Sequence, residues 1–257
     1  MSRAVPHVVR MLVVVCLLFA ARSAAASPVP RTARITAARL DPRVRGKYAE
    51  TTLDGMLAFP VQNTTTVVYL HGIHGLAANG CPWMRSGGGS LVCPEANVAL
   101  PNGTFSWSGR ADVDHAVVAR AERAARGSST VLVGFSQGAY VATDIVEAGL
   151  GKYRGLVLLS ADVSPSAKAL ADAGIRRVVL GAGELDGSFA PMKKTAERLA
   201  REGVEVRFVS LGRVGHTYQA EDREALAAAI AWACGDDGAP AARPGDALVL
   251  RRLTAGA

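Results

Sequence analysis

Short apolar runs alternate with amphipathic segments along most of this chain. Runs of β-branched and other apolar residues predict strands at 66–70, 97–100, 129–133, 156–159, 177–180 and 204–209. Apolar residues at helical spacing predict helices at 111–126, 138–149, 191–203 and 221–233. This alternation favours an α/β fold, in which a mostly parallel central sheet carries helices on both faces.

The same pattern makes more detailed predictions. The helix at 111–126 is expected to bury a face made of Val113, Ala116, Val117, Ala121 and Ala124. The only long irregular segment spans about 76–96, and no insertion is long enough for a large helical lid domain. Strand 204–209 is predicted to be the last. Residues 235–257, rich in Ala, Gly, Pro, Asp and Arg, are expected to form a flexible C-terminal tail.

The first 26 residues have the pattern of a secretory signal peptide. Arg3 and Arg10 precede or border an apolar run of 11 residues, and the small residues at 24–26 offer a cleavage site. The run is far shorter than the roughly 20 residues of a membrane-spanning helix. Cys16 lies within the run without the small preceding residues of a lipidation site. We therefore expect a secreted or periplasmic protein with no stable membrane anchor.

Positive charge is concentrated near the start of the mature chain. The net charge of +7 falls to +4 once the leader is removed. Residues 27–57 are interpreted as a basic N-terminal arm with the first strands, and residues 58–234 as the catalytic domain. Aromatic residues do not interleave with the basic ones before Tyr48, so nucleic-acid binding is not expected. An anionic surface and plain solvation both remain open as the role of the arm.

The cysteines of the mature chain predict one disulfide and one free thiol. Cys81 and Cys93 lie in one loop, each followed by proline, and an exported chain favours their pairing. Cys234 is then left free near the end of the last helix. Full reduction of all three is the alternative. The chain has no C-x-x-C pair and no His spacing suited to a metal site, so no metal or other cofactor is expected.

The segment Gly134-Phe135-Ser136-Gln137-Gly138 carries the clearest chemical signal. It is a G-x-S-x-G element between a predicted buried strand and a predicted helix. A serine on such a sharp strand-to-helix turn has its hydroxyl exposed at the carboxyl edge of the sheet, and small flanking residues permit the close backbone approach. Ser136 is therefore the candidate nucleophile.

A serine nucleophile needs a base and an orienting carboxylate. Asp186 follows strand 177–180 and His216 follows strand 204–209, so both lie at strand carboxyl ends, where Ser136 also lies. The order Ser, acid, His is the one expected after a G-x-S-x-G turn. Glu184 and Asp162 are the rival acids.

Acyl transfer also needs N–H groups that stabilise the developing oxyanion. The residue after the nucleophile, Gln137, is one expected donor. The second is Ile73, because Gly72 lets the chain turn after strand 66–70. His71 and His74 are interpreted mainly as supports of this loop, with a metal or second-base role as the alternative.

With these motifs, the chain resembles the α/β-hydrolase superfamily, nearest the small carboxylesterase, acyl-thioesterase and dienelactone-hydrolase-like group. The resemblance covers residues 60–234 and rests on four segments, which are 134–138, 71–73, 183–186 and 215–216. A further similarity at Ser106-Trp107 implies that Trp107 flanks the acyl site, with a core tryptophan as the alternative, and His74 is a second pocket candidate. The resemblance implies an α/β-hydrolase fold. The spacing of Pro191 after the acid and the cysteine-containing loop depart from the group's pattern.

The sequence therefore predicts a secreted serine hydrolase that cleaves carboxylic esters of small molecules or lipids through an acyl-enzyme. A thioesterase, lysophospholipase or polyester hydrolase with the same mechanism is the nearest alternative. A non-catalytic binding module on the same scaffold is the alternative from another class. The pattern carries no signal for the oligomeric state.

Overall fold

The computed structural model describes residues 51–237 and 247–250. The predicted leader at 1–26 and most of the basic arm lie outside these residues. The described strands of the main sheet are β1 Thr51–Leu53, β2 Met56–Phe59, β3 Thr65–Leu70, β4 Ser90–Cys93, β7 Ser129–Phe135, β8 Gly155–Leu159, β9 Arg177–Ala182, β10 Glu205–Ser210 and β11 Ala247–Leu250. Their order in the sheet is β1-β2-β4-β3-β7-β8-β9-β10-β11.

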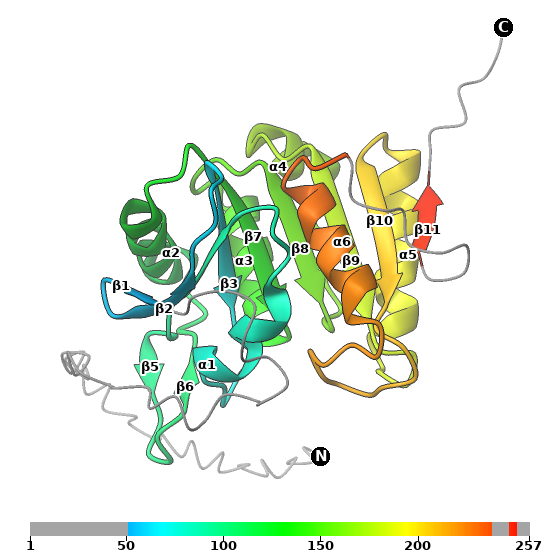
Figure 1. Ribbon diagram of the computed structural model, residues 1–257. Helices are drawn as coiled ribbons and strands as arrows, with labels where there is room; N and C mark the ends of the chain where they lie inside the picture. Colours follow the sequence, from blue (N-terminus) through cyan, green and yellow to red (C-terminus); the bar gives the residue numbers. More distant parts are fainter. Residues whose placement is uncertain (1–50, 238–246, 251–257) are drawn as a thin grey trace, which may run out of the picture. The chain divides into compact units, whose positions relative to one another are not determined.

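The six strands from β4 to β10 in that order are parallel, and antiparallel strands extend the sheet on both sides. β1 and β2 lie beside β4, and β11 lies beside β10. Because every parallel strand points the same way, the loops that follow them meet at one edge (Figure 1). A separate two-stranded sheet pairs β5 Val98–Ala99 with β6 Phe105–Ser106.

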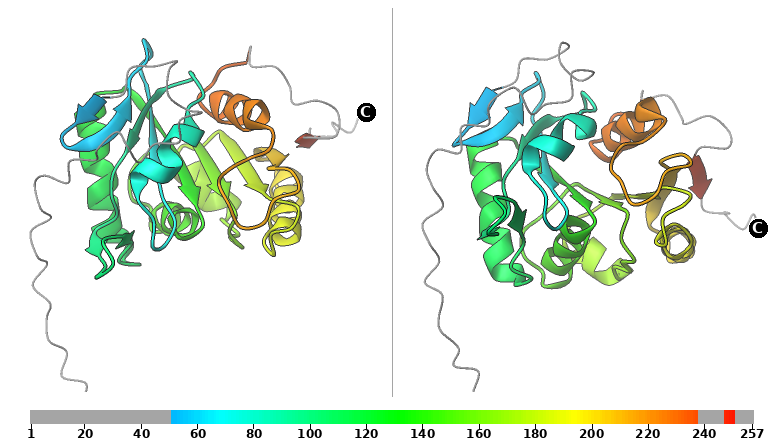
Figure 2. Two further views of the ribbon diagram at one scale, coloured as in Figure 1. Left: turned by 60° about the horizontal axis from the view of Figure 1, so that its bottom comes forward. Right: turned by 90° about the horizontal axis from the view of Figure 1, so that it is seen from below.

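Helices cover both faces of the sheet, as predicted (Figures 1 and 2). The longer ones are α2 Ala111–Ala125, α3 Gln137–Glu147, α5 Phe189–Arg201 and α6 Arg223–Ala233, and the short ones are α1 Ala77–Gly80, η3 Cys81–Met84 and α4 Ala167–Asp172. Alternate residues of each strand point to opposite faces. Leu132, for example, packs in the core with α2 to α5, whereas Val131 and Val133 pack in the core with α1, η3 and α6.

Several boundaries differ from the predictions. The segment 76–96, predicted to be irregular, contains α1, η3 and β4. Segment 97–100 does not join the main sheet, because its residues 98–99 are exposed and pair with β6 instead. β10 is not the last strand, since β11 forms within the predicted tail. The boundary drawn between residues 57 and 58 falls inside β2.

The buried face of α2 agrees with the prediction in part. Ala121 is buried and Val117 and Ala124 pack against the core, whereas Ala116 is exposed and the other buried residues are Asp114 and Val118. The Asp114 carboxylate accepts hydrogen bonds from Asn97 Nδ2 at 2.6 Å, from the hydroxyl and N–H of Ser108, and from the N–H of Gly109. A carboxylate can be buried at low cost when such donors satisfy it. This polar anchor, rather than an apolar stripe, fixes the start of α2.

Candidate active site

Ser136 occupies the sharp turn between β7 and α3. Its backbone has φ 53° and ψ −120°, a conformation that non-glycine residues rarely adopt. The chains around it are very close: a Cβ on Gly138 would lie 2.0 Å from the Leu70 carbonyl oxygen, and one on Gly134 would lie 2.3 Å from the Gly138 carbonyl oxygen. Both glycines are therefore required by backbone packing, which explains the small residues of the motif.

The structure brings Ser136, His216 and Asp186 together in one hydrogen-bonded chain. His216 Nε2 lies 2.8 Å from Ser136 Oγ, and His216 Nδ1 lies 2.9 Å from Asp186 Oδ2. A carboxylate can only accept, so Nδ1–H donates to Asp186, and Nε2 of the neutral ring accepts from the Ser136 hydroxyl. Phe135 packs against the His216 ring with centroids 5.2 Å apart. We call this arrangement the Ser136–His216–Asp186 relay.

Asp186 is held as a carboxylate by its surroundings. Its side chain is only 6% exposed, and burial acts to raise its pKa. The Ser188 N–H, which donates to Asp186 Oδ1 at 3.0 Å, and the bond from His216 outweigh burial, so that the pKa lies below its usual range. The buried hydroxyls of Ser160 and Ser188 also lower this pKa, although neither meets the geometry of a formal hydrogen bond.

The rival acids do not reach His216. The Glu184 carboxylate instead accepts a hydrogen bond from the Ser210 hydroxyl at 3.0 Å, and Asp162 is exposed. Of the three candidates, Asp186 is the one whose carboxylate contacts the imidazole. Ser160 follows β8, so its proximity to Asp186 depends on two different strands and has no local signal, whereas Ser188 lies two residues after Asp186 in the same loop.

The two expected oxyanion donors lie beside Ser136. A Cβ on Gly72 would be 3.2 Å from the Ser136 Cβ, so the loop carrying Ile73 touches the turn. Among the residues that the structure describes, no acceptor pairs with the backbone N–H of Ile73 or Gln137. Two unpaired N–H groups next to a serine hydroxyl are the arrangement that an oxyanion requires.

His71 supports this loop, which was one of its two predicted roles. It is 2% exposed, its Nδ1–H donates to the Gly72 carbonyl at 2.8 Å, and its Nε2 accepts from the Ala96 N–H at 3.1 Å. This pattern describes a neutral ring that links the loop to the segment after β4. His74, in contrast, is exposed with a φ of 54°. It remains a candidate for the substrate pocket.

Trp107 supports the loop from the core, in agreement with the core interpretation of this residue, and its place beside the acyl site stays a prediction. It is 3% exposed, and its indole N–H donates to the His71 carbonyl at 2.8 Å. The Gln137 side chain accepts hydrogen bonds from the Trp107 N–H and the Ser106 hydroxyl. Only a backbone role was predicted for Gln137, so these bonds to its side chain were not expected.

Four exposed large apolar residues lie on loops and elements that adjoin those of the relay. In the described part of the chain, the exposed large hydrophobic side chains are those of Ile73, Val98, Tyr140 and Leu185. Ile73 follows Gly72, Tyr140 lies one turn after Ser136 on α3, and Leu185 precedes Asp186. Val98 lies in the β5–β6 hairpin, which is joined to the Ile73 loop by a bridge between Gly75 and Phe105. We call these four residues the apolar rim.

The cysteines behave as predicted. Cys81 and Cys93 form a disulfide with their Cα atoms 6.0 Å apart, which links η3 to the carboxyl end of β4. Cys234 is a buried free thiol, and its burial raises its pKa to about 12. Within residues 54–237 no three His, Cys, Asp or Glu side chains group as metal ligands. None of the helices described is long and apolar enough to cross a membrane.

The sequence matches no protein-family model and no curated protein. Solved structures of similar fold include TT1662 from Thermus thermophilus, at 19% identity and a TM-score of 0.52, over 73% of this chain and 98% of that one. An esterase/lipase from an uncultured bacterium is similar at 13% identity and a TM-score of 0.50, over 73% and 83% of the two chains. An uncharacterized protein from Bacillus cereus has 20% identity and a TM-score of 0.55, over 73% and 62%.

Proposed function

We propose that this chain, which has the α/β-hydrolase fold, is a serine hydrolase that cleaves carboxylic esters through an acyl-enzyme. The observation that carries the proposal is the continuous Ser136–His216–Asp186 relay, with contacts of 2.8 and 2.9 Å. Each residue follows a different parallel strand, so the fold must be complete before the three groups meet.

In the proposed reaction, Ser136 Oγ attacks the ester carbonyl carbon while its proton passes to His216 Nε2. The N–H groups of Ile73 and Gln137 stabilise the oxyanion of the tetrahedral intermediate. When that intermediate collapses, the imidazolium returns the proton to the leaving alkoxide and the alcohol departs. Water then attacks the acyl-enzyme with His216 as base, which releases the acid and restores Ser136. The charged Asp186 stabilises the imidazolium throughout.

The apolar rim favours esters with an apolar acyl chain. Exposed apolar side chains near a reactive group are typical of a binding surface, and Ile73, Tyr140 and Leu185 lie close in sequence to Gly72, Ser136 and Asp186. The His216 side chain is 54% exposed, which would also allow an extended substrate to reach the relay from outside. This supports lysophospholipids or polyesters as a second candidate class. A thioester would follow the same mechanism. We propose export for the chain, and the Cys81–Cys93 disulfide is compatible with it.

The direct test is hydrolysis of p-nitrophenyl esters, from acetate to palmitate, by the wild type and Ser136→Ala. We expect the variant to lose about 10⁴-fold or more in kcat while it keeps the wild-type melting temperature within a few degrees. The matched control is Ser164→Ala, an exposed serine that contacts Arg198 and should retain activity. Equal turnover by wild type and Ser136→Ala would contradict the nucleophile assignment.

A second reagent separates the enzyme from a non-catalytic module. A fluorophosphonate should label the wild type at Ser136 and leave Ser136→Ala unlabelled, whatever the natural substrate. A folded wild type that takes up no label and hydrolyses no ester would favour the binding-module alternative. A maximum of kcat/KM at long acyl chains would support the role of the apolar rim, and a maximum at acetate would oppose it.

A further inference from the structure

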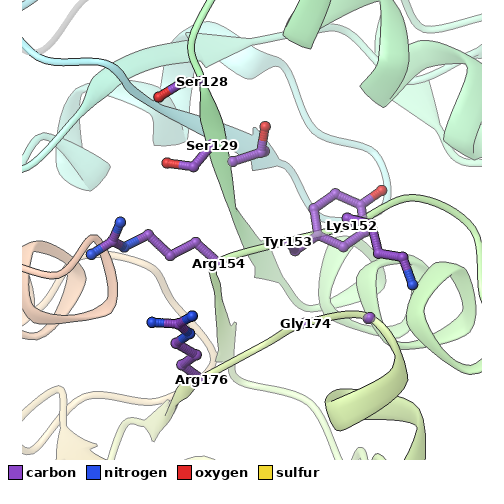
Figure 3. Close-up of a pocket in the computed structure, with 9 residues that line it drawn as sticks. Ser128, Ser129, Lys152, Tyr153, Arg154, Gly174 and Arg176 are labelled. Carbon is purple, nitrogen blue, oxygen red and sulfur yellow. The ribbon is translucent and has the colours of Figure 1, made fainter.

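A cavity of about 310 Å³ opens at the end of the sheet opposite to the relay (Figure 3). It lies where β7, β8 and β9 begin. Its lining residues are Ser128, Ser129, Thr130, Lys152, Tyr153, Arg154, Ala173, Gly174 and Arg176. Three of the nine are cationic and none is acidic. We call Lys152, Arg154 and Arg176 the basic triplet.

The two arginines of the basic triplet lie side by side. Gly155 of β8 and Arg177 of β9 are register partners, so Arg154 and Arg176 precede the same point of two neighbouring strands. The Arg176 N–H donates to the Arg154 carbonyl at 3.1 Å. Figure 3 shows their guanidinium ends on the same side of the cavity. Like charges on adjacent strands repel each other, and an anion bound between them would relieve that repulsion.

The described acids of this region form no ion pair with the two arginines. In the part of the chain that the structure describes, no carboxylate forms an ion pair with Arg154 or Arg176. Asp172 pairs with Lys168, and Asp237 pairs with Arg177. Asp236 also lies nearby, since its charge raises the pKa of the Cys234 thiol while the charge of Arg154 lowers it.

The floor of the cavity is held by backbone hydrogen bonds. Arg154 N–H donates to the Thr130 carbonyl at 2.7 Å, and Tyr153 N–H donates to the Ala173 carbonyl at 2.9 Å. Lys152 Nζ donates to the Asp172 carbonyl at 2.6 Å, and Figure 3 shows it on the other side of the cavity from the two guanidinium groups. The positions from which the three cations extend are therefore preset, and little backbone order needs to be gained on binding.

We propose that this cavity binds a phosphate group carried by a small molecule. One guanidinium can donate two N–H groups to two phosphate oxygens at once. Two guanidinium groups at the start of neighbouring strands therefore suit the tetrahedral oxygens of a phosphate. A phosphomonoester carries about −1.5 to −2 charges at neutral pH, which matches the two guanidinium groups better than the single charge of a carboxylate would. The hydroxyls of Ser128, Ser129 and Thr130 make the remaining wall polar, as the group that bears the phosphate would require.

The proposed site is separate from the relay and does not depend on its function. β7 spans Ser129–Phe135, so the cavity and Ser136 are separated by the length of a seven-residue strand, roughly 20 Å. A ligand in the cavity would therefore not occupy the site of ester hydrolysis, and its binding can be measured with Ser136→Ala as well as with the wild type.

The test is titration calorimetry of the full chain with inorganic phosphate and with glycerol 3-phosphate at low salt. We expect both to bind, glycerol 3-phosphate more tightly, and each of Arg154→Gln and Arg176→Gln to weaken binding about tenfold. The matched control is Arg123→Gln, which removes an exposed charge from α2 and should bind like the wild type. Both arginines of the site are exposed, so the variants should fold, and their melting curves verify this.

A vesicle-binding assay distinguishes a lipid headgroup from a soluble molecule as the source of the phosphate. Sedimentation with phosphatidic acid vesicles, against phosphatidylcholine vesicles, detects binding to a lipid headgroup. Retention on phosphatidic acid that Arg154→Gln abolishes would support a headgroup as the source, whereas soluble phosphate binding alone supports a free metabolite. No binding of phosphate in any form, or equal weakening by Arg123→Gln and Arg154→Gln, would overturn the proposal.

Discussion

The two ends of β7, β8 and β9 carry different chemistry on the same three strands. At the carboxyl ends, Ser136 and the Asp186 loop meet His216 in a chain of paired polar groups, and the apolar rim adjoins them. At the amino ends, Arg154 and Arg176 lie side by side without a paired carboxylate among the described residues. At the carboxyl ends the charged groups bond to one another, whereas at the amino ends the two guanidinium groups have no ion-pair partner among the described residues.

The parallel topology of the sheet brings functional side chains together at its two ends. Each end of a parallel sheet collects one loop from every strand, so residues distant in sequence become neighbours without any local signal. The carboxyl end has additional constraints, because the Cys81–Cys93 disulfide and the His71–Trp107 contact hold its loops. The amino end is held by backbone hydrogen bonds between strands. Changes at the two ends should therefore have very different consequences.

The largest effect is expected when the acid of the relay is neutralised. Asp186→Asn should reduce kcat by about 10³- to 10⁴-fold, because an amide no longer stabilises the imidazolium or selects the right tautomer of His216. The rival acids are the controls: Glu184→Gln and Asp162→Asn should stay within about twofold of the wild type on a soluble p-nitrophenyl ester. A larger loss in either control than in Asp186→Asn would assign the acid elsewhere.

A glycine-to-alanine pair compares backbone packing at the two ends. Gly138→Ala should destabilise the fold by about 3 kcal/mol or more, because its Cβ would lie 2.0 Å from the Leu70 carbonyl oxygen. Gly174→Ala, at the amino end, should cost about 1 kcal/mol, because it strains a φ of +79° where the nearest atom is 3.7 Å away. Urea unfolding measures both, and equal losses would show that close approach does not distinguish the two ends.

Removal of the disulfide tests the covalent constraint at the carboxyl end. The bond closes a short loop, with a sequence separation of 12, so its loss should lower the free energy of unfolding by about 3 kcal/mol. The double variant Cys81→Ala/Cys93→Ala, compared with the wild type in urea, gives the value. Cys234→Ala, which leaves the disulfide intact, is the control for loss of a buried sulfur. A loss no greater than that of Cys234→Ala would mean that the bond adds no constraint.

The smallest effect concerns acid stability. Because the folded-state pKa of Asp186 lies below its ordinary value, the carboxylate stabilises the fold fully above pH ~4, and this contribution is lost as pH falls through the lower, folded-state pKa. The stability difference between wild type and Asp186→Asn should therefore shrink between pH 5 and the acid range below pH ~3. A difference that grows on acidification would contradict the direction of the shift.

Local patterns predicted the turn at Ser136 and the order of the relay residues. Both depend on short-range features, which are the strand before the turn, the small residues around it, and the strands that precede Asp186 and His216. Strand β4 was missed because its partners lie in β2 and β3, and the segment around it is rich in glycine. Asp114 was missed because a carboxylate becomes a core residue only when distant donors reach it.

The sequence by itself determined the alternation of strands and helices, the strained serine turn and the candidate residues of the relay, because each depends on side-chain periodicity or on glycine at fixed positions. Only the tertiary structure decided that Asp186 and not Glu184 contacts His216, that Trp107 braces the loop of Ile73, and that two arginines meet at the far end of the sheet. The choice between Asp186 and Glu184 depends on the conformation of the loop after β9, and the other two outcomes depend on which strands and loops become neighbours, which is a property of the whole fold.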